Sequence, residues 1–190
     1  MASRRIDDLE RSFRPQVRAL ISAANEAGLE PTVYQTLRSP YEQARLWRMT
    51  RGTPIIADQI RDLRDKGASF IAHCLEVVGP QFPGPNIKGH VTHAVPGRSW
   101  HQHGEAVDFY VKGGTGDIAW ESSDNGWDQY EEVARLARDA GLESGWFWPG
   151  KKKDPGHVQA RKGSTLNVFG GWVGLDANLK RLFENVDPET

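Results

Sequence analysis

The sequence predicts an α+β domain in which several helices pack around a small, mostly antiparallel sheet. Two observations lead to this prediction. Amphipathic stretches with the period of helices are interspersed with short segments of strand character, and turns rich in glycine and proline separate them. The 190 residues are enough to bury a hydrophobic core, so we expect one domain over residues 1–190.

The N-terminal half is predicted to be mainly helical. Helices are expected at 15–27, 40–50 and 55–78, the last broken near Gly67, and a strand is expected at 32–36. The first helix has Pro15 near its start and Gly28 after its end, which are common positions for these residues. Ser39 and Glu42 form a capping box with proline at the first helical position. This places Arg38 at the end of a strand, directly before a helix.

The C-terminal half is predicted to supply the rest of the sheet. A long loop rich in glycine and proline is expected at 79–98, strands at 106–111, 142–148 and 157–159, and helices at 127–140 and 176–186. The strand at 106–111 alternates in polarity and ends at a run of glycines. Between the last two strands, residues 149–155 read as a turn that contains three lysines.

Charge and composition exclude several classes of protein. The 24 basic and 25 acidic residues leave a net charge of -1, which argues against a nucleic-acid partner and against attraction to anionic membranes. No run approaches the ~18 apolar residues of a membrane span. The charged start lacks the apolar region of a secretory signal, so synthesis in the cytoplasm is expected. The single cysteine, Cys74, leaves histidine and carboxylate as the ligands for any metal.

One polar cluster near the middle of the chain carries the candidate chemistry. Asp108 lies within a predicted strand among apolar neighbours, where an unpaired carboxylate is costly to bury. His101 can fold back beside it across a turn at Gly104, and His157 follows Asp154 by three residues at the edge of a later strand. Two histidines and one aspartate fill three positions of a tetrahedral zinc site and leave the fourth for water. The alternative is a hydrogen-bonded polar cluster without a metal.

The cluster resembles the signature of the M15 zinc peptidases. That family includes D-alanyl-D-alanine carboxypeptidases and dipeptidases, and phage L-alanyl-D-glutamate endopeptidases. Its Ser-x-His-x-x-Gly-x-Ala-x-Asp pattern is filled at every specified position, by Ser99, His101, Gly104, Ala106 and Asp108. The second half of the pattern, an acid three residues before the last ligand, is matched by Asp154 and His157.

Two upstream elements extend the resemblance. Arg38 with Ser39 and Gln43 is similar to the Arg-Ser-x-x-x-Gln element of the family, and residues 91–97 resemble its Val-Thr-Asn-Ala-x-Pro-Gly lead-in, with histidine at the asparagine. The matches appear in family order over a core of about 31–160. Residues 161–190 form an extension that ends in a helix.

The resemblance implies a fold like that of the hedgehog and D-Ala-D-Ala peptidase proteins. It also implies a role for each matched residue. One zinc ion would be held by His101, Asp108 and His157. Asp154 would be the general base and Arg38 would stabilise the oxyanion of the attacked amide. From the residues alone, Asp154 could instead start a turn and Arg38 could pair with a carboxylate. Substrate contacts are expected from Ser99, Trp100 at the pocket rim, and Gln43.

The expected function is hydrolysis of peptidoglycan stem peptides by a monomer. Aspartate at the base position and Gly156 before the last ligand resemble the endopeptidases that cut between L-Ala and D-Glu. The expected setting is a phage or prophage endolysin, released to the wall by a separate membrane-permeabilising protein. One alternative is a D-alanyl-D-alanine carboxypeptidase or dipeptidase. A second is a non-catalytic, zinc-stabilised module that binds the cell wall.

Overall fold

The computed structural model describes residues 2–79, 92–112 and 127–188. Contacts divide the chain into two compact units, each assembled from separate stretches of sequence. We call them the helical unit, which spans 38–102 and 163–190, and the sheet unit, which spans 2–37 and 103–162. Helices and an antiparallel sheet together confirm the α+β class. The assignment of 1–190 to one domain stays a prediction.

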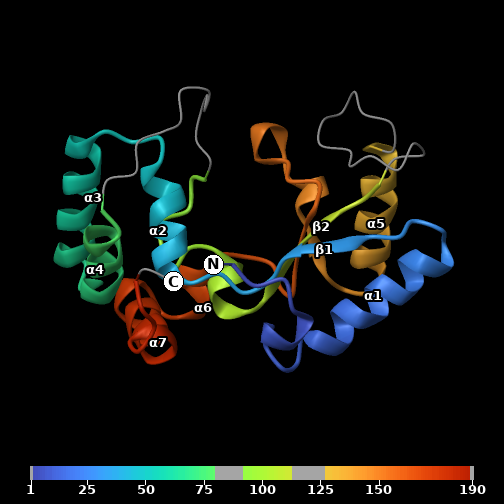
Figure 1. Ribbon diagram of the computed structural model, residues 1–190, viewed down its shortest axis with the longest axis horizontal. Helices are drawn as coiled ribbons and strands as arrows, with labels where there is room; N and C mark the ends of the chain where they lie inside the picture. Colours follow the sequence, from blue (N-terminus) through green and yellow to red (C-terminus); the bar gives the residue numbers. More distant parts are fainter. Residues whose placement is uncertain (1, 80–91, 113–126, 189–190) are drawn as a thin grey trace. The chain divides into compact units, whose positions relative to one another are not determined.

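The sheet unit is built on four short strands in the order β1-β2-β4-β3. They are β1 (Thr32–Gln35), β2 (Ala106–Tyr110), β3 (Glu143–Ser144) and β4 (His157–Gln159), and all neighbours are antiparallel (Figure 1). Asp108 of β2 lies opposite His157 of β4, and Val107 lies opposite Val158. Successive side chains of a strand point to opposite faces, so the polar pair and the apolar pair lie on different faces of the sheet.

The apolar face of this sheet packs against α1 (Arg14–Glu26) and α5 (Trp127–Asp139), which lie together in Figure 1. The resulting core consists of Leu9, Phe13, Val17, Leu20, Val107, Phe109, Ala137, Leu142 and Val158. Each fully buried side chain of this kind contributes about 1.5–3 kcal/mol. The core therefore fixes the strands whose other face carries the polar residues.

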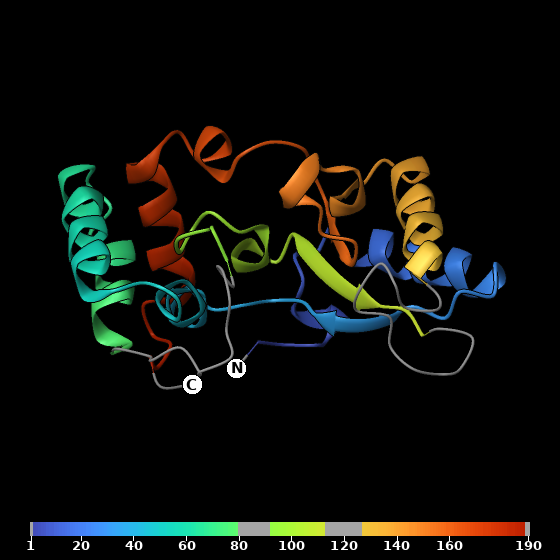
Figure 2. The ribbon, with the colours of Figure 1, turned by 90° about the horizontal axis from the view of Figure 1, so that it is seen from above.

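The helical unit contains five α-helices among its described residues. They are α2 (Pro40–Arg48), α3 (Thr53–Asp65), α4 (Ser69–Val77), α6 (Thr165–Val168) and α7 (Trp172–Phe183), and Figure 2 shows α3, α4 and α7 beside one another. A carboxylate oxygen of Asp176 in α7 accepts from the backbone N–H of Ile71 at 2.8 Å. This bond satisfies a donor in the first turn of α4 and joins two helices that are far apart in sequence.

Most predicted elements are confirmed within a few residues. The interruption near Gly67 separates α3 from α4, and Ser39 caps α2 by accepting from the backbone N–H of Glu42 at 3.1 Å. Residues 80–91 of the predicted loop lie outside the described residues. Among the residues that the structure describes, no helix has the length and apolar character that a membrane span requires.

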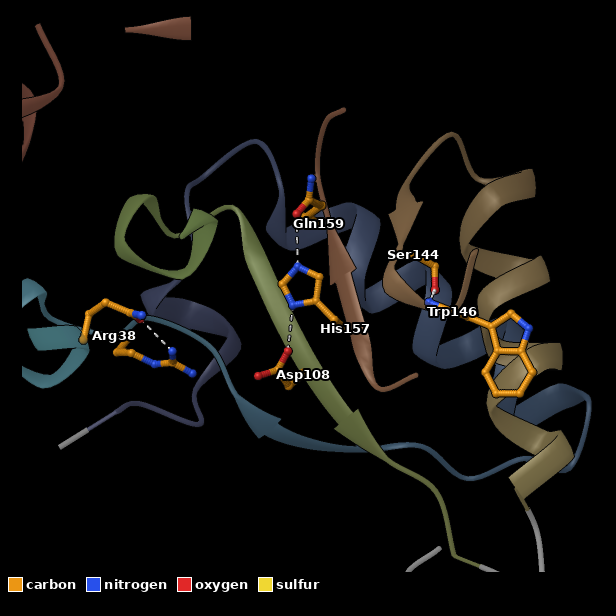
Figure 3. Close-up of polar contacts among 7 residues, drawn as sticks. Arg38, Asp108, Ser144, Trp146, His157 and Gln159 are labelled. Atoms are coloured by element: carbon orange, nitrogen blue, oxygen red, sulfur yellow. Dashed lines mark hydrogen bonds and ion pairs between the residues drawn. The ribbon is translucent and has the colours of Figure 1, made fainter. Parts of the chain in front are cut away.

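The strand predicted at 142–148 is wrong beyond Ser144. The chain leaves the sheet there and forms the 3₁₀ turn η3 (Gly145–Phe147). The Ser144 hydroxyl accepts from the backbone N–H of Trp146 at 3.2 Å (Figure 3), a local bond that competes with sheet pairing. A Cβ at Gly145 would collide with the backbone oxygen of Asp154, so the close approach of two loops also requires glycine there.

The last helix differs from its predicted range of 176–186. It begins four residues earlier, after Gly171, and it ends at Phe183. Leu175, Leu179 and Phe183 form its buried face, whereas Leu182 is exposed. The helix packs against α4. The short helix α6 was not predicted.

Replacing Gly156 with alanine is expected to destabilise the sheet unit by about 1–3 kcal/mol. A Cβ at this position would collide with the backbone oxygen of Phe109, one strand residue beyond Asp108. Urea unfolding of the variant measures the loss. The matched control is Gly52→Ala, because a Cβ at Gly52 meets only a Pro54 atom at 3.8 Å. Equal stability of the two variants would contradict this packing.

Candidate metal centre

The polar face of the sheet brings Asp108 and His157 together. They are directly opposite residues of β2 and β4, and Oδ1 of Asp108 lies 2.9 Å from Nδ1 of His157 (Figure 3). The imidazole is buried and the carboxylate is half-buried. On the other side of the ring, Nε2 of His157 lies 3.0 Å from Oε1 of Gln159. Oxygen atoms therefore flank both ring nitrogens.

This arrangement raises the pKa of His157. Burial disfavours the charged imidazole and lowers its pKa, but the hydrogen bond and charge of Asp108, the charge of Asp154 and the bond to Gln159 outweigh that effect. The reason lies in the 2.9 Å contact. A neutral imidazole with its proton on Nε2 would turn a lone pair toward the carboxylate, and only a proton or another cation between the two atoms makes that contact favourable.

His101 supplies the third potential ligand. It lies in the 3₁₀ helix η2 (Trp100–His103), which is connected to β2 by two residues, and its side chain is buried. One ligand atom from each of His101, Asp108 and His157 can be chosen so that all three lie within 4.8 Å of one another. Two imidazole nitrogens and one carboxylate oxygen suit zinc, and three protein ligands leave a position for a fourth. The residues present fit the metal that the sequence suggested.

Asp154 lies in a tight turn before β4, the strand of the potential ligand His157. Its backbone N–H donates to the oxygen of Gly145 at 2.9 Å, and its backbone oxygen accepts from the N–H of His157 at 3.1 Å. The turn leaves its side chain exposed. The charge of the carboxylate nevertheless reaches His157, since it contributes to the raised pKa of the imidazole. The structure therefore places an accessible acid next to the last ligand.

Arg38 is held in place by both its backbone and its side chain. Its backbone N–H donates to the oxygen of His101 at 3.2 Å, and its Nη1 donates to Oε1 of Gln43 at 2.7 Å (Figure 3). The amide nitrogen of Gln43 donates to Ala94 O at 2.7 Å and to Oγ1 of Thr92 at 3.2 Å. Gln43 is fully buried, so its position favours orientation of Arg38 over the substrate contact that the sequence suggested.

The predicted substrate residues Ser99 and Trp100 differ in exposure. Trp100 does not lie at a pocket rim as expected, since it is only 4% exposed. Its indole N–H donates to the oxygen of Gly163 at 3.1 Å, and its ring lies against Phe169. A large apolar ring with one satisfied donor is more stable buried than exposed, which explains this placement. Ser99 is half-buried, and its role in substrate binding stays a prediction.

Two residues near His157 were missed by the sequence analysis. The ring of Trp148 lies 5.1 Å from the imidazole, centre to centre, and its indole N–H donates to Oε1 of Glu143 at 3.1 Å. No pattern in the sequence indicates this contact. Gln159 contacts the ring directly, and it could have been found because it follows His157 by two residues in a strand and so shares its face.

Comparisons with known proteins identify a family and relatives for this chain. A family model described as VanY, D-alanyl-D-alanine carboxypeptidase, matches residues 7–160. The peptidoglycan L-alanyl-D-glutamate endopeptidase CwlK of Bacillus subtilis (strain 168) is 35% identical over 73 residues, which cover 36% of this chain and 43% of that relative. The match therefore spans less than half of the relative's length.

Solved structures with similarity to this chain include two peptidases. The L-Ala D-Glu endopeptidase ChiX of Serratia marcescens has a TM-score of 0.41 and 21% identity, with 85% of this chain and 89% of that chain covered. A mutant of the vancomycin resistance D,D-pentapeptidase VanY from a VanB-type cassette, in complex with Zn(II), has a TM-score of 0.42 and 21% identity, with 80% and 71% covered.

In metal-free protein, the stabilising effect of the Asp108–His157 pair is expected to weaken as the pH rises. The pKa of His157 is higher in the folded than in the unfolded chain, where it is about 6.5. Between the unfolded and the folded pKa of His157, the folded state binds more protons than the unfolded state. The stabilisation by the pair is therefore complete below the unfolded pKa and is lost as the pH rises through the folded pKa. Urea unfolding of chelator-treated wild type and Asp108→Asn from pH 5 to 9 measures this stabilisation. A difference between the two proteins that stays constant with pH would refute the coupling.

Proposed function

The chain belongs to the VanY family of D-alanyl-D-alanine carboxypeptidases, and we propose that it is a zinc-dependent peptidase that hydrolyses the stem peptides of peptidoglycan. The observation that carries the proposal is the ligand group of His101, Asp108 and His157, with the exposed acid Asp154 one turn before its last member. A non-catalytic wall-binding module would need neither this accessible acid nor an arginine held as Arg38 is.

Each of the three proposed ligands would offer the ion one atom from a different element of the structure. When bound, zinc supplies Lewis acidity and a hydroxide nucleophile at neutral pH. Asp108 offers an anionic oxygen from the centre of the sheet, where pairing with both neighbouring strands holds its backbone. His157 offers Nδ1 from the adjacent strand, and His101 offers a ring nitrogen from η2. Ligands that lie on paired strands, as Asp108 and His157 do, keep their positions more precisely than ligands on loops.

Asp154 is proposed as the general base and acid. Its exposed carboxylate can accept the proton of the attacking water and return it to the nitrogen of the departing amine. The backbone hydrogen bond from His157 to Asp154 closes the turn that holds the acid next to the nearest proposed ligand. A positioned proton carrier of this kind contributes about 10²- to 10⁴-fold in rate.

Arg38 is proposed to stabilise the negative charge that develops on the attacked carbonyl oxygen. Arg38 is half-buried, and the bond to the buried amide of Gln43 limits the conformations that its side chain adopts. Preorganised donors are effective because they need no rearrangement as charge develops. Loss of one such donor typically costs about 10²- to 10³-fold in kcat.

For the bond that is cut, we propose the one between L-alanine and D-glutamate. The relative named as an L-alanyl-D-glutamate endopeptidase supports this, as does aspartate at the position of the base. The family's description favours a second candidate, removal of terminal D-alanine. We also propose that the enzyme serves as a phage or prophage endolysin that reaches the wall after the membrane has been permeabilised.

Replacing Asp154 with asparagine is expected to lower muropeptide cleavage by about 10²- to 10⁴-fold while zinc content and unfolding midpoint stay as in the wild type. The carboxamide has nearly the shape of the carboxylate but cannot carry the proton. The matched control is Asp139→Asn, which changes an exposed acid at the end of α5. Cleavage at the wild-type rate in the Asp154 variant would refute its role.

Incubation with purified muropeptides and mass spectrometry of the products identifies the bond. We expect free tripeptide or tetrapeptide that begins with D-glutamate, together with disaccharide-L-alanine. Release of D-alanine alone would assign the chain to the carboxypeptidases instead. Suspensions of bacterial cells, with and without prior permeabilisation of their membranes, test the lytic role. We expect the suspension to clear only after permeabilisation.

A further inference from the structure

We propose that Gln159 is a positioning residue that orients the imidazole of His157 for the metal. Its amide oxygen accepts the hydrogen on Nε2, so that the lone pair of Nδ1 would be directed at the metal. The inference rests on the proposed zinc site and adds to it a residue outside the ligand set. The hydrogen bonds around the amide of Gln159 carry the argument.

A backbone carbonyl fixes the orientation of the Gln159 amide. Nε2 of Gln159 donates to the oxygen of Arg161 at 2.7 Å. A carbonyl oxygen can only accept, so the NH₂ end of the amide must face it, and Oε1 must point the other way. That oxygen lies 3.0 Å from Nε2 of His157. Since Oε1 also can only accept, the hydrogen between these two atoms belongs to the imidazole.

The opposite tautomer would misdirect the ligand. Asp108 by itself favours a proton on Nδ1, because its carboxylate oxygen lies 2.9 Å from that nitrogen and only accepts. A neutral ring with its proton on Nδ1 would turn its remaining lone pair toward Gln159 and away from Asp108. With a metal on Nδ1, the one proton of the neutral ring must lie on Nε2, where Oε1 of Gln159 is placed to accept it. The ring would therefore need no rotation to bind the metal.

The surroundings of Gln159 keep its amide from turning. The side chain is only 5% exposed, so water cannot replace a lost partner. Its backbone lies in β4 opposite Ala106, and the next residue, Ala160, donates its N–H to the oxygen of Glu105 at 2.9 Å. The side chains of Glu105 and Arg161 form an ion pair. These contacts hold the Arg161 carbonyl that orients the amide.

The test compares Gln159→Leu with the wild type. The substitution removes the acceptor for Nε2–H of His157. The ring-nitrogen NMR shifts of His157 in zinc-loaded protein report whether Nε2–H is hydrogen-bonded, and zinc affinity is measured by competition with a chromophoric chelator. We expect Gln159→Leu to lose the hydrogen-bond signature of Nε2–H and to bind zinc about 10- to 100-fold more weakly.

A variant of the intervening residue separates orientation from general destabilisation. Val158 lies between His157 and Gln159 but faces the apolar core, so Val158→Ala should lower stability and leave the Nε2–H signal and zinc affinity unchanged. The inference alone is overturned if the wild type binds zinc and Gln159→Leu binds it equally tightly, or if Val158→Ala weakens zinc binding as much as Gln159→Leu does. If the wild type binds no zinc, the proposed function fails and the inference fails with it.

Discussion

Two atoms that both carry lone pairs face each other across the central strands of this protein, and the functional site depends on that contact. The carboxylate oxygen of Asp108 and Nδ1 of His157 are 2.9 Å apart, which is favourable only with a proton or a metal ion between them. Burial of the ring makes the requirement stronger, because little water is present to screen the pair. The raised pKa of His157 and the fit of this face to zinc are two results of one arrangement.

The sheet holds this arrangement because its two faces serve different purposes. Val107 and Val158 point into the core beneath α1 and α5, and their burial fixes the register of β2 against β4. The same register sets Asp108 opposite His157 on the other face. A slip of one residue would exchange the faces, so the register that buries the apolar core is also the one that places the proposed metal ligands opposite each other. Gly145 and Gly156 have no Cβ, which allows the loops beside Asp154 and His157 to pass close to the neighbouring backbone.

Two buried glutamines perform parallel tasks, Gln43 in the helical unit and Gln159 in the sheet unit. The amide nitrogen of Gln43 donates to the backbone oxygen of Ala94, and that of Gln159 donates to the backbone oxygen of Arg161. In each case the amide oxygen is thereby directed at a functional side chain, Arg38 in the first and His157 in the second. A neutral, satisfied amide can orient a cation or an imidazole without adding a charge to a buried site.

The sequence alone determined the features that depend on neighbours along the chain. The helix that follows Arg38 has its own cap, and the proposed ligands of the metal centre were identified from spacing and family resemblance. Tertiary structure decided the rest: the early end of β3, the earlier start of α7, the burial of Trp100 and the contact of Trp148 with His157. Each of these depends on groups brought together by folding, whose competing interactions no local pattern can rank.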